Sequence, residues 1–317
     1  MRRTIPTTRR RSGGYTLVEL MVTLVLSLLL LSAGLAFYMM SRNSYATIDD
    51  SANLQERGNF AISVVTRMLR QTAFTPPASG GGGLMTVDDP MIDGKDHCAA
   101  PQITPDANGL QRVTCGGGVA INNSDAVMIR FFGISNPDGT PDGSVVDCAG
   151  MAVGALDEKN KNTAAKQRGL ALLYVDTGSN GKPALMCKYP ERKNGAVVPD
   201  SYVTQELVPG VEAFQVLYGI AVNDDEVPDK FVTADQIGTN EWDMVLTAKV
   251  AMVVRTDNLN ATGTDAGTFN LFGTLGSSLP DASYVPKVDT KAARKLYTAT
   301  VQLHNYLTCY KGDVLCF

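Results

Sequence analysis

The stretch Gly14-Tyr15-Thr16-Leu17-Val18-Glu19-Leu20 decides the fold of this chain, because it opens an apolar run that continues to about Met40. Five arginines precede the stretch within residues 1–11, and no acidic residue accompanies them. One carboxylate, Glu19, lies just inside the apolar run, which carries no other charge before Arg42. About 20 apolar residues suffice to span a bilayer, so the run predicts a membrane-spanning helix.

Two ordinary explanations leave part of this stretch unexplained. A secretory signal has a shorter apolar core with its small-residue cleavage site after that core, whereas Gly14 precedes the core here. A plain single-pass anchor accounts for the length of the run but gives no reason for Glu19. A carboxylate in the middle of a membrane helix costs about 2.5–3.5 kcal/mol, and less near the interface, where it can reach the headgroups. An intramembrane carboxylate therefore indicates a functional residue with a partner.

With these features the stretch resembles the class III signal of type IV prepilins and type II secretion pseudopilins. In that family a prepilin peptidase cleaves after the glycine and methylates the new N-terminus. The resemblance implies cleavage between Gly14 and Tyr15, followed by N-methylation of Tyr15. The usual first residue of the mature chain is Phe, so Tyr15 departs from the pattern but keeps an aromatic ring. The resemblance also implies that Glu19 pairs with the N-terminal amine of a neighbouring subunit during assembly.

Charge distribution predicts the orientation of the chain in the membrane. The positive-inside rule keeps the arginine-rich leader in the cytoplasm and places the body in the periplasm, so that the precursor is a single-pass inner-membrane protein. Removing residues 1–14, with five arginines and no acidic residue, changes the formal net charge from −4 to −9. So acidic a body is a poor candidate for direct nucleic-acid binding, which needs clustered Lys and Arg.

The cysteines predict disulfides, since their even number lies in the part of the chain expected to reach an oxidising compartment. Sequence alone leaves many pairings open. The favoured set pairs neighbours in the sequence, so that each bond closes one loop-rich section. The six residues, in the order of these pairs, are Cys98 and Cys115, Cys148 and Cys187, and Cys309 and Cys316.

The helix is expected to continue beyond the membrane. Between Ser41 and Ala73 there is no proline and a single glycine, and apolar residues recur at helical spacing. Pro76-Pro77 and the glycines after them end the helix. One continuous helix fits this pattern, and so does an anchor followed by a second helix after a kink near Gly34 or Ser41. The residues expected on the apolar stripe are Ile48, Leu54, Ala61, Val64, Val65, Met68 and Leu69.

The remaining sequence predicts a β-rich domain. Residues 84–124 contain many turn-forming residues and are expected to form a disulfide-pinned excursion outside the core. Later segments are rich in β-branched and aromatic residues. An antiparallel sheet laid over the helix would bury the stripe, which gives an α+β fold of the pilin-like kind. The expected strands are Ala126–Phe132, Gly169–Val175, Leu185–Tyr189, Val211–Ile220, Val245–Val254 and Leu296–Leu303.

Several of these later segments resemble PilW-type minor pilins, relatives of the J-type pseudopilins. Leu207–Gly219 is the most distinctive block, and Tyr297–Asn305 resembles a closing strand that usually ends Arg-Asn, where this chain has His304. The stretch from Arg57–Phe60 through Met68–Phe74 resembles the end of their long helix, and Val127–Gly133 and Asp147–Gly150 resemble two further blocks. The resemblance implies a minor pilin that helps prime type IV pilus assembly, ends near the pilus tip and serves twitching motility or adhesion.

That resemblance also implies a set of partners and an organisation of the chain. The partners are the prepilin peptidase, the other minor pilins, the major pilin, the inner-membrane assembly platform and, before assembly, inner-membrane lipid. The expected parts are a leader at 1–14, the transmembrane half of the helix at 15–40, its amphipathic half at 41–75, and a periplasmic or extracellular domain at 76–317. Two alternatives remain open: a J-type pseudopilin of type II secretion, and a membrane-tethered binding or adhesive domain that never assembles.

Catalytic and metal-binding patterns are weak. His97-Cys98 with Cys115 lacks the ligand spacing of a zinc site, and a disulfide beside a surface histidine is the better interpretation. Residues 138–143 lack the spacing and the terminal Glu of a helix–loop–helix calcium site, so a pair of turns is favoured there. No nucleophile, base or phosphate-loop motif is present, so neither an enzyme nor a cofactor is predicted.

Overall fold

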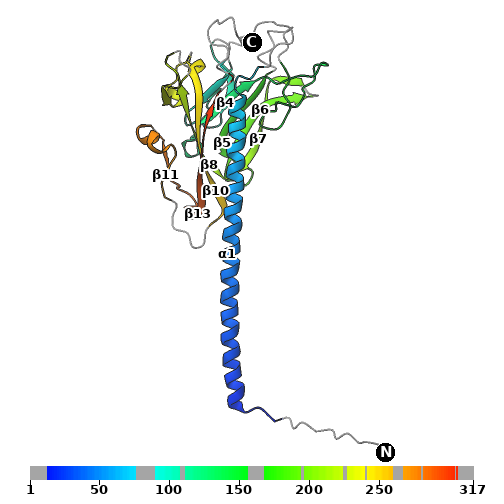
Figure 1. The fold of residues 1–317 in the computed structure, drawn as a ribbon, viewed down its shortest axis with the longest axis vertical. Coiled ribbons are helices and arrows are strands. Elements are labelled where there is room, and N and C mark those ends of the chain that lie inside the picture. The colour runs from blue at the N-terminus through cyan, green and yellow to red at the C-terminus, as the bar shows by residue number, and fades with distance from the viewer. Residues whose placement is uncertain are drawn as a thin grey trace, which may run out of the picture. The chain divides into compact units, whose positions relative to one another are not determined.

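A computed structural model describes residues 13–75, 90–107, 111–155, 168–193, 196–223, 227–239, 241–259, 267–279, 281–303 and 305. Figure 1 shows the fold as a long helix and a domain of β-strands. The chain divides into two units, Met1–Asp49 and Asp50–Phe317.

Helix α1 extends from Leu17 to Gln71 without interruption, so neither Gly34 nor Ser41 breaks it. Its start is fixed by Thr16, whose side-chain oxygen accepts a hydrogen bond of 3.2 Å from the backbone N–H of Glu19. The backbone carbonyl of Thr16 also accepts the first helical bond, from the N–H of Leu20. Thr16 is therefore the N-cap residue of α1 and satisfies one of the N–H groups that a helix end leaves unpaired.

Within the second unit, α1 buries one stripe of small and apolar residues at the spacing of three and four that places them on one helix face. Most of the predicted stripe is confirmed. Ile48 is the exception, because its side chain is exposed and the buried stripe begins only at Leu54. The buried residues are Leu54, Gly58, Ala61, Val64, Val65, Met68 and Leu69.

The strands of the described residues form two larger antiparallel sheets and two small two-stranded sheets. The five-stranded sheet has the order β1-β4-β5-β6-β7, and the four-stranded sheet has the order β13-β10-β8-β9. Their strands are β1 (Ile92–Lys95), β4 (Ala126–Phe131), β5 (Gly169–Thr177), β6 (Pro183–Lys193), β7 (Ala196–Pro209), β8 (Val211–Ile220), β9 (Lys230–Val232), β10 (Val245–Leu259) and β13 (Ala292–Gln302). The two-stranded sheets pair β2 (Gln102–Pro105) with β3 (Gln111–Thr114) and β11 (Phe269–Asn270) with β12 (Ser283–Tyr284).

The stripe on α1 and the inner faces of both sheets form one continuous core. The chain therefore has the predicted α+β fold, with a long N-terminal helix and antiparallel sheets. Strand β8 has the predicted bounds, and all ten of its residues are buried. One face of β8 belongs to the main core, and the other packs Ala213 and Leu217 against Leu271 and Phe272.

Residues 84–124 are not simply an excursion outside the core. Within the described part of this segment, β1 pairs with β4 and fully buries Ile92 in the main core. Val113 of β3 joins a second cluster, in which Met128 of β4 and Leu172 of β5 are also buried. The prediction failed because β1 has only four residues, one of them the buried Asp93, and turn residues flank it.

Candidate functional site

The N-terminal end of α1 brings together the residues that the sequence singled out. Gly14 and Tyr15 precede the helix, and the Tyr15 side chain is 83% exposed. Thr16 caps the helix, and Glu19 occupies the third helical position. Helix N-termini carry a partial positive charge, so a carboxylate in the first turn is stabilising, typically by about 0.3–1 kcal/mol. Glu19 is thus placed both at the helix end and at the border of the apolar run.

Glu19 is exposed, and among the described residues it forms no ion pair. The backbone N–H of Glu19 donates a hydrogen bond to the side-chain oxygen of Thr16 at the helix start. A carboxylate in this arrangement can accept hydrogen bonds from a cation on another molecule. The chemistry that the site offers is therefore electrostatic pairing, and an ammonium group is a suitable partner.

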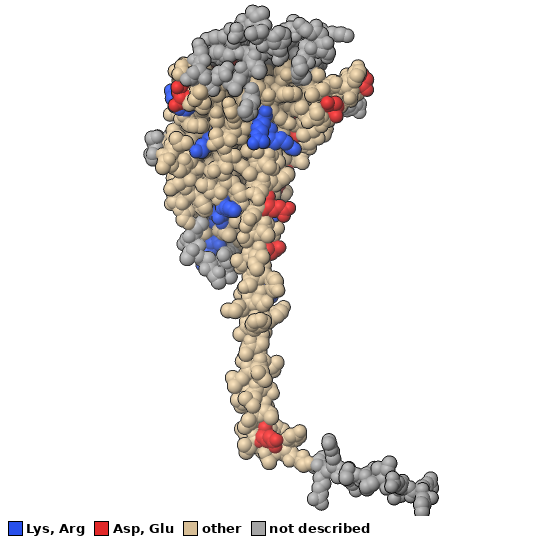
Figure 2. Space-filling view, viewed as in Figure 1, with Lys and Arg blue, Asp and Glu red and all other residues tan. Residues whose placement is uncertain are grey.

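The helix beyond Glu19 exposes an almost continuous apolar surface. Its most apolar 18-residue window has a mean hydropathy of 2.5 with none of it buried, so α1 is long and apolar enough to cross a membrane. Figure 2 shows this segment without blue or red side chains, except for red near its N-terminal end. Large exposed side chains include Leu20, Val22, Leu24, Leu30, Phe37 and Met40. A surface of this size requires lipid or other apolar helices around it.

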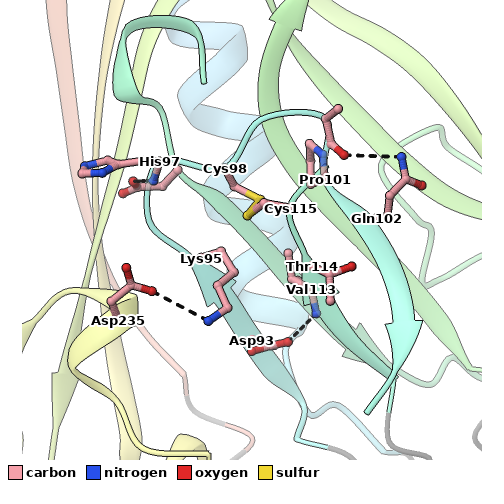
Figure 3. The surroundings of a disulfide bond; sticks show 12 residues. Asp93, Lys95, His97, Cys98, Pro101, Gln102, Val113, Thr114, Cys115 and Asp235 are labelled. Carbon is pink, nitrogen blue, oxygen red and sulfur yellow. Dashed lines mark hydrogen bonds and ion pairs between the residues drawn. A yellow bond between two sulfur atoms is a disulfide. The ribbon is translucent and has the colours of Figure 1, made fainter. Parts of the chain in front are cut away.

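Four of the six cysteines form two disulfides in the structure. Cys98 is bonded to Cys115, with Cα atoms 5.1 Å apart, and Cys148 is bonded to Cys187, with Cα atoms 6.4 Å apart. These two pairs are the favoured ones. Cys309 and Cys316 lie outside the described residues. The first bond ties the segment after β1 to the end of β3 (Figure 3), and the second ties the loop before residue 150 to the middle of β6.

The disulfide Cys98–Cys115 excludes these two thiols as zinc ligands. Neighbouring His97 instead contacts a carboxylate, with 2.6 Å between its Nε2 and Asp281 Oδ2, and its backbone N–H donates to Asp125 Oδ1. Figure 3 shows Asp93 pointing toward the N–H of Val113, which donates a bond of 2.7 Å. Among the described residues no group of three His, Cys, Asp or Glu side chains could hold a metal ion. His304 lies outside the described residues.

Residues 138–143 form two successive turns in the structure. Asp138 Oδ1 accepts bonds from the N–H and hydroxyl of Thr140, and Asp142 Oδ1 accepts the same pair from Ser144. These bonds lower the pKa of both aspartates, the hydroxyl bond contributing most in each case. The carboxylates therefore form hydrogen bonds within the two turns, as the pair-of-turns interpretation predicts.

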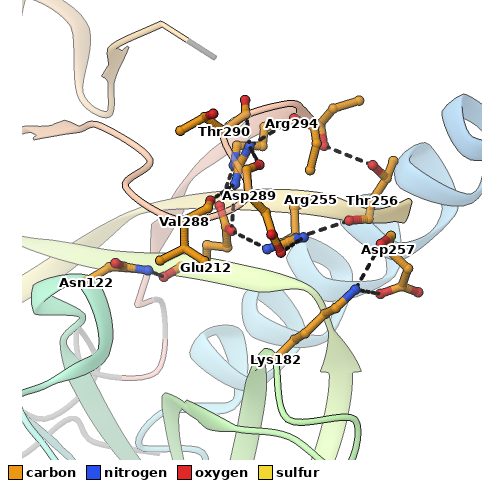
Figure 4. Close-up of polar contacts among 12 residues, drawn as sticks. Asn122, Lys182, Glu212, Arg255, Thr256, Asp257, Val288, Asp289, Thr290 and Arg294 are labelled. Carbon is orange, nitrogen blue, oxygen red and sulfur yellow. Dashed lines mark hydrogen bonds and ion pairs between the residues drawn. The ribbon is translucent and has the colours of Figure 1, made fainter. Parts of the chain in front are cut away.

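A buried charge network, which sequence analysis missed, joins β8, β10 and β13 (Figure 4). The carboxylate of Glu212 accepts bonds from Arg294 Nε at 2.6 Å and Arg255 Nη1 at 3.2 Å, and from the hydroxyl of Tyr284 at 3.0 Å. Arg255 also reaches Asp289 at 2.6 Å, so the four charges balance. Burial, followed by the charge of Glu212, raises the pKa of Tyr284, while the Arg255 bond lowers that of Asp289. The pairing of three strands that are far apart in the sequence brings these charged residues together. No short sequence motif could therefore have predicted the network.

The comparison with protein families then decides the identity. The family model described as type IV pilus-assembly protein W matches residues 172–305, and the prokaryotic N-terminal methylation motif matches residues 9–35. The chain belongs to the PilW-type pilins. It is a minor pilin of pilus biogenesis, and membership implies processing by a prepilin peptidase, contacts with other pilins and anchoring in a membrane before assembly.

The two matched regions cover different parts of this PilW-type pilin. The methylation motif contains Gly14, Tyr15 and Glu19 together with most of the apolar segment, up to residue 35. The PilW match begins in β5 and ends at Asn305, so it includes the Glu212 network and the closing strand β13. In contrast, α1 beyond residue 35 and strands β1 to β4 lie outside both matches.

Comparisons with individual proteins add little to the family match. A search of curated proteins found no match. Among solved structures, the type IV-like pilin TTHA1219 from Thermus thermophilus is similar at 15% sequence identity and a TM-score of 0.38. That similarity covers 80% of this chain and 98% of the Thermus chain.

Proposed function

We propose that this minor pilin helps prime type IV pilus assembly at the inner membrane and is incorporated near the pilus tip. The observation that carries the proposal is the position of Glu19, a single carboxylate in the first turn of an exposed apolar helix. A helix that only anchored a domain would gain no more than the small first-turn stabilisation from this charge, and would still have a carboxylate at the border of the membrane. A helix that docks against other subunits gains an electrostatic contact that fixes its position along theirs.

Assembly would proceed in two steps at this end of the chain. Cleavage between Gly14 and Tyr15 by a prepilin peptidase removes the arginine-rich leader, and methylation of Tyr15 leaves an N-terminal amine. Glu19 then pairs with the corresponding amine of a neighbouring subunit inside the apolar filament interior. Electrostatic attraction is stronger there than in water, and leaving either charge unpaired is costly, so the pair sets the register between helices.

The remaining parts follow from this assignment. Residues 1–14 form the cytoplasmic leader, 15–40 the membrane half of the helix, 41–75 its amphipathic half, and 76–317 the periplasmic domain that is later displayed on the pilus. The partners are other minor pilins, the major pilin, the assembly platform and inner-membrane lipid. The acidic domain is not expected to bind DNA directly, and the protein acts as a structural subunit without catalysis. Twitching motility and adhesion would be the cellular outputs.

The N-terminal mass of the protein isolated from membranes of its own host tests this proposal first. A mature chain that begins at N-methylated Tyr15 is expected. An intact Met1, or a cut after the apolar run, would contradict the proposal and favour a tethered or secreted domain. To separate a pilus from a secretion filament, the chain is deleted. Loss of surface pili with normal protein secretion supports the pilus, and the reverse result supports the J-type alternative.

A further inference from the structure

We propose that a polar hollow, lined by residues of β8, β12 and the short helix η1 (Ile121–Asn123), binds a neutral sugar unit. The inference deepens the adhesive output of the proposed function, and it rests on that function for the display of the domain outside the cell. The hollow has a volume of about 240 Å³. Sites for drug-sized ligands have volumes of about 300–1,000 Å³, so this hollow suits a single small ring.

The residues around the hollow divide into a buried set that is mainly apolar and an exposed set that is mainly polar. Ala213 of β8, Leu271 after β11 and Tyr284 of β12 are buried. The Glu212 network holds Tyr284 in place, because the Tyr284 hydroxyl donates to the Glu212 carboxylate at 3.0 Å. The exposed polar residues are Asn122, Asn123, Ser283 and Lys287. An apolar lining with a few convergent polar groups is the usual composition of a small-molecule site.

Gln215 of β8 supplies a buried hydrogen-bond acceptor. The residue lines the hollow although it is only 6% exposed. Its Nε2 donates a hydrogen bond of 2.6 Å to the backbone carbonyl oxygen of Asn123. Only the NH2 end of an amide can donate to a carbonyl oxygen, so this bond fixes which end of the side chain is Oε1. Among the described residues no group donates to Oε1, and an unpaired buried acceptor is costly, so a ligand that donates a hydrogen bond is favoured there.

The two asparagines of η1 have the same arrangement. Asn122 Nδ2 donates a bond of 2.8 Å to the backbone carbonyl oxygen of Glu212 (Figure 4), and Asn123 Nδ2 donates a bond of 3.0 Å to Asp281 Oδ1. Each side chain therefore uses its NH2 group within the protein and keeps its carbonyl oxygen as an acceptor. Together with Gln215, the hollow has three such amide oxygens, which are complementary to a ligand with several O–H or N–H donors.

The charges around the hollow favour hydroxyl donors over ammonium donors. The described lining residues include one carboxylate, Asp281, and one ammonium group, Lys287. Asp281 already has partners, because Asn123 donates to its Oδ1 and His97 Nε2 lies 2.6 Å from its Oδ2. An ammonium ligand would therefore meet Lys287 without a free carboxylate. A neutral hydroxyl both donates and accepts, so it suits the amide oxygens as well as Lys287 and the hydroxyl of Ser283.

Size, hydrogen bonding and charge together identify the ligand class. A compact ring that carries several neutral hydroxyls and also has apolar C–H groups is a sugar. Its hydroxyls would donate to the amide oxygens of Asn122, Asn123 and Gln215, and its C–H groups would contact Ala213 and Leu271.

Saturation-transfer NMR on the full chain, solubilised in a detergent without a sugar headgroup, tests the inference. The probes are the methyl glycosides of glucose, galactose, mannose and N-acetylglucosamine, with putrescine as a diamine that offers N–H donors. We expect transfer to at least one glycoside that is about fivefold or more stronger than transfer to putrescine. No transfer to any of the glycosides, or transfer to putrescine that is equal or stronger, would overturn the inference.

Two variants and a matched control locate the site. Ser283→Phe places a ring at an exposed position that lines the hollow, and Ser179→Phe does the same at an exposed serine between β5 and β6 that does not line it. Ser283→Phe should lower the transfer by about fivefold or more, and Ser179→Phe should leave it unchanged. Asn122→Gly removes one amide oxygen at a φ of 50°, which glycine adopts readily, and should lower the transfer about fivefold.

The fluorescence of Trp242 and the two described disulfides show whether each variant is folded. Wild-type transfer in folded Ser283→Phe or in folded Asn122→Gly would show that the sugar binds elsewhere and would refute the inference.

The N-terminal mass of the same protein separates this inference from the proposed function. A chain that begins at N-methylated Tyr15 but binds no glycoside refutes the sugar inference alone. A chain with an intact Met1 that binds a glycoside, and loses it on Ser283→Phe, refutes the proposed function and leaves the sugar site supported.

Discussion

The aromatic ring of Tyr297 lies directly against Gly58 of α1, and its hydroxyl donates a hydrogen bond of 3.0 Å to the carbonyl oxygen of Leu54. A Cβ atom at position 58 would lie 2.1 Å from two ring atoms of Tyr297, closer than non-bonded atoms can approach. Gly58, the single glycine in the amphipathic half of the helix, is therefore a point of close contact between β13 and α1.

This contact predicts that Gly58→Ala destabilises the second unit by about 1–3 kcal/mol, the range for overpacking a core, although alanine is the better helix former. Unfolding of the detergent-solubilised full chain is followed by the fluorescence of Trp242, the single tryptophan, which is buried. Gly34→Ala is the matched control, because a Cβ atom at Gly34, in the same helix, would have nothing within 4 Å. Equal stabilities of the two variants would contradict the prediction.

The end of α1 is held by Asn305, whose side-chain amide donates bonds of 3.0 Å to the carbonyl oxygens of Arg70 and Thr72. Helix ends leave such carbonyls without helical partners, so we expect Asn305→Ala to cost about 1–2 kcal/mol. Urea denaturation monitored through Trp242 measures the loss. Gln302→Ala, at an exposed position of β13, should change the unfolding midpoint little. If both variants unfold at the wild-type midpoint, Asn305 does not secure the helix.

The Glu212 network predicts that breaking a buried ion pair lowers the free energy of unfolding much more than breaking a partly exposed one. Glu212→Gln keeps the shape of the side chain but leaves Arg255 and Arg294 without their shared carboxylate, and we expect a loss of about 3–5 kcal/mol. Asp257→Asn breaks a half-exposed pair with Arg57, at 2.7 Å, and should cost below about 1 kcal/mol. Thermal unfolding of both variants provides the measurement. Similar losses would show that burial does not determine the strength of these pairs.

Asp125 predicts an unusual dependence of stability on pH. Burial, the largest cause, raises the pKa of its carboxyl well above the usual value, although the N–H groups of His97 and Val216 donate to it. A raised folded pKa means that the folded state binds the proton more tightly. The charged group therefore lowers stability as pH rises from the unfolded pKa, about 3.9, through the folded pKa.

Free energies of unfolding between pH 4 and pH 8 test this sign. The stability of the wild type relative to Asp125→Asn should fall as the pH rises. Asp138→Asn is the control, because the pKa of Asp138 is lowered, so its contribution is present above the unfolded pKa, is lost only as the pH falls through the folded pKa, and should stay nearly constant over the range tested. A wild-type-minus-Asp125→Asn difference that does not vary with pH would contradict the assignment.

The proposed role in assembly predicts that substitution of Glu19, in the first helical turn, reduces piliation. Glu19→Ala should lower the number of surface pili strongly, because the amine of the neighbouring subunit would lose its counter-charge in an apolar environment. Pili are counted by electron microscopy, with protein level and N-terminal processing measured in parallel. Glu56→Ala removes an exposed carboxylate elsewhere on the same helix and should leave piliation unchanged. Normal piliation in the Glu19 variant would favour a tethered domain that does not assemble.

Sequence patterns predicted the elements in which the same face or faces stay buried along the whole buried segment. Strand β8 is apolar over nearly its whole length because it is buried on both faces, and α1 shows a stripe because it is buried on one. The edge strand β7 gave no such signal, since Val203, Thr204 and Gln205 in its middle are all exposed and the strand contains Pro199. For the candidate site, Gly14, Tyr15 and Glu19 lie in one short segment, so the sequence alone could single them out, and their roles in cleavage and pairing stay a prediction. The contacts of Gly58 with Tyr297 and of Glu212 with Arg294 depend on distant segments and could not be foreseen.

Distance along the chain between α1 and its closing residues also has a consequence for the order of folding. The Tyr297–Leu54 bond spans 243 residues and the Asn305–Arg70 bond spans 235. Helix α1 is synthesised early, but the strand that covers Gly58 and the residue that caps its end are among the last to be made. Contacts of such large separation form slowly, because the long loop between them must first close. The apolar stripe of a nascent chain therefore waits for nearly complete synthesis before it is covered, and a chain shortened before residue 297 would present that stripe to chaperones and proteases.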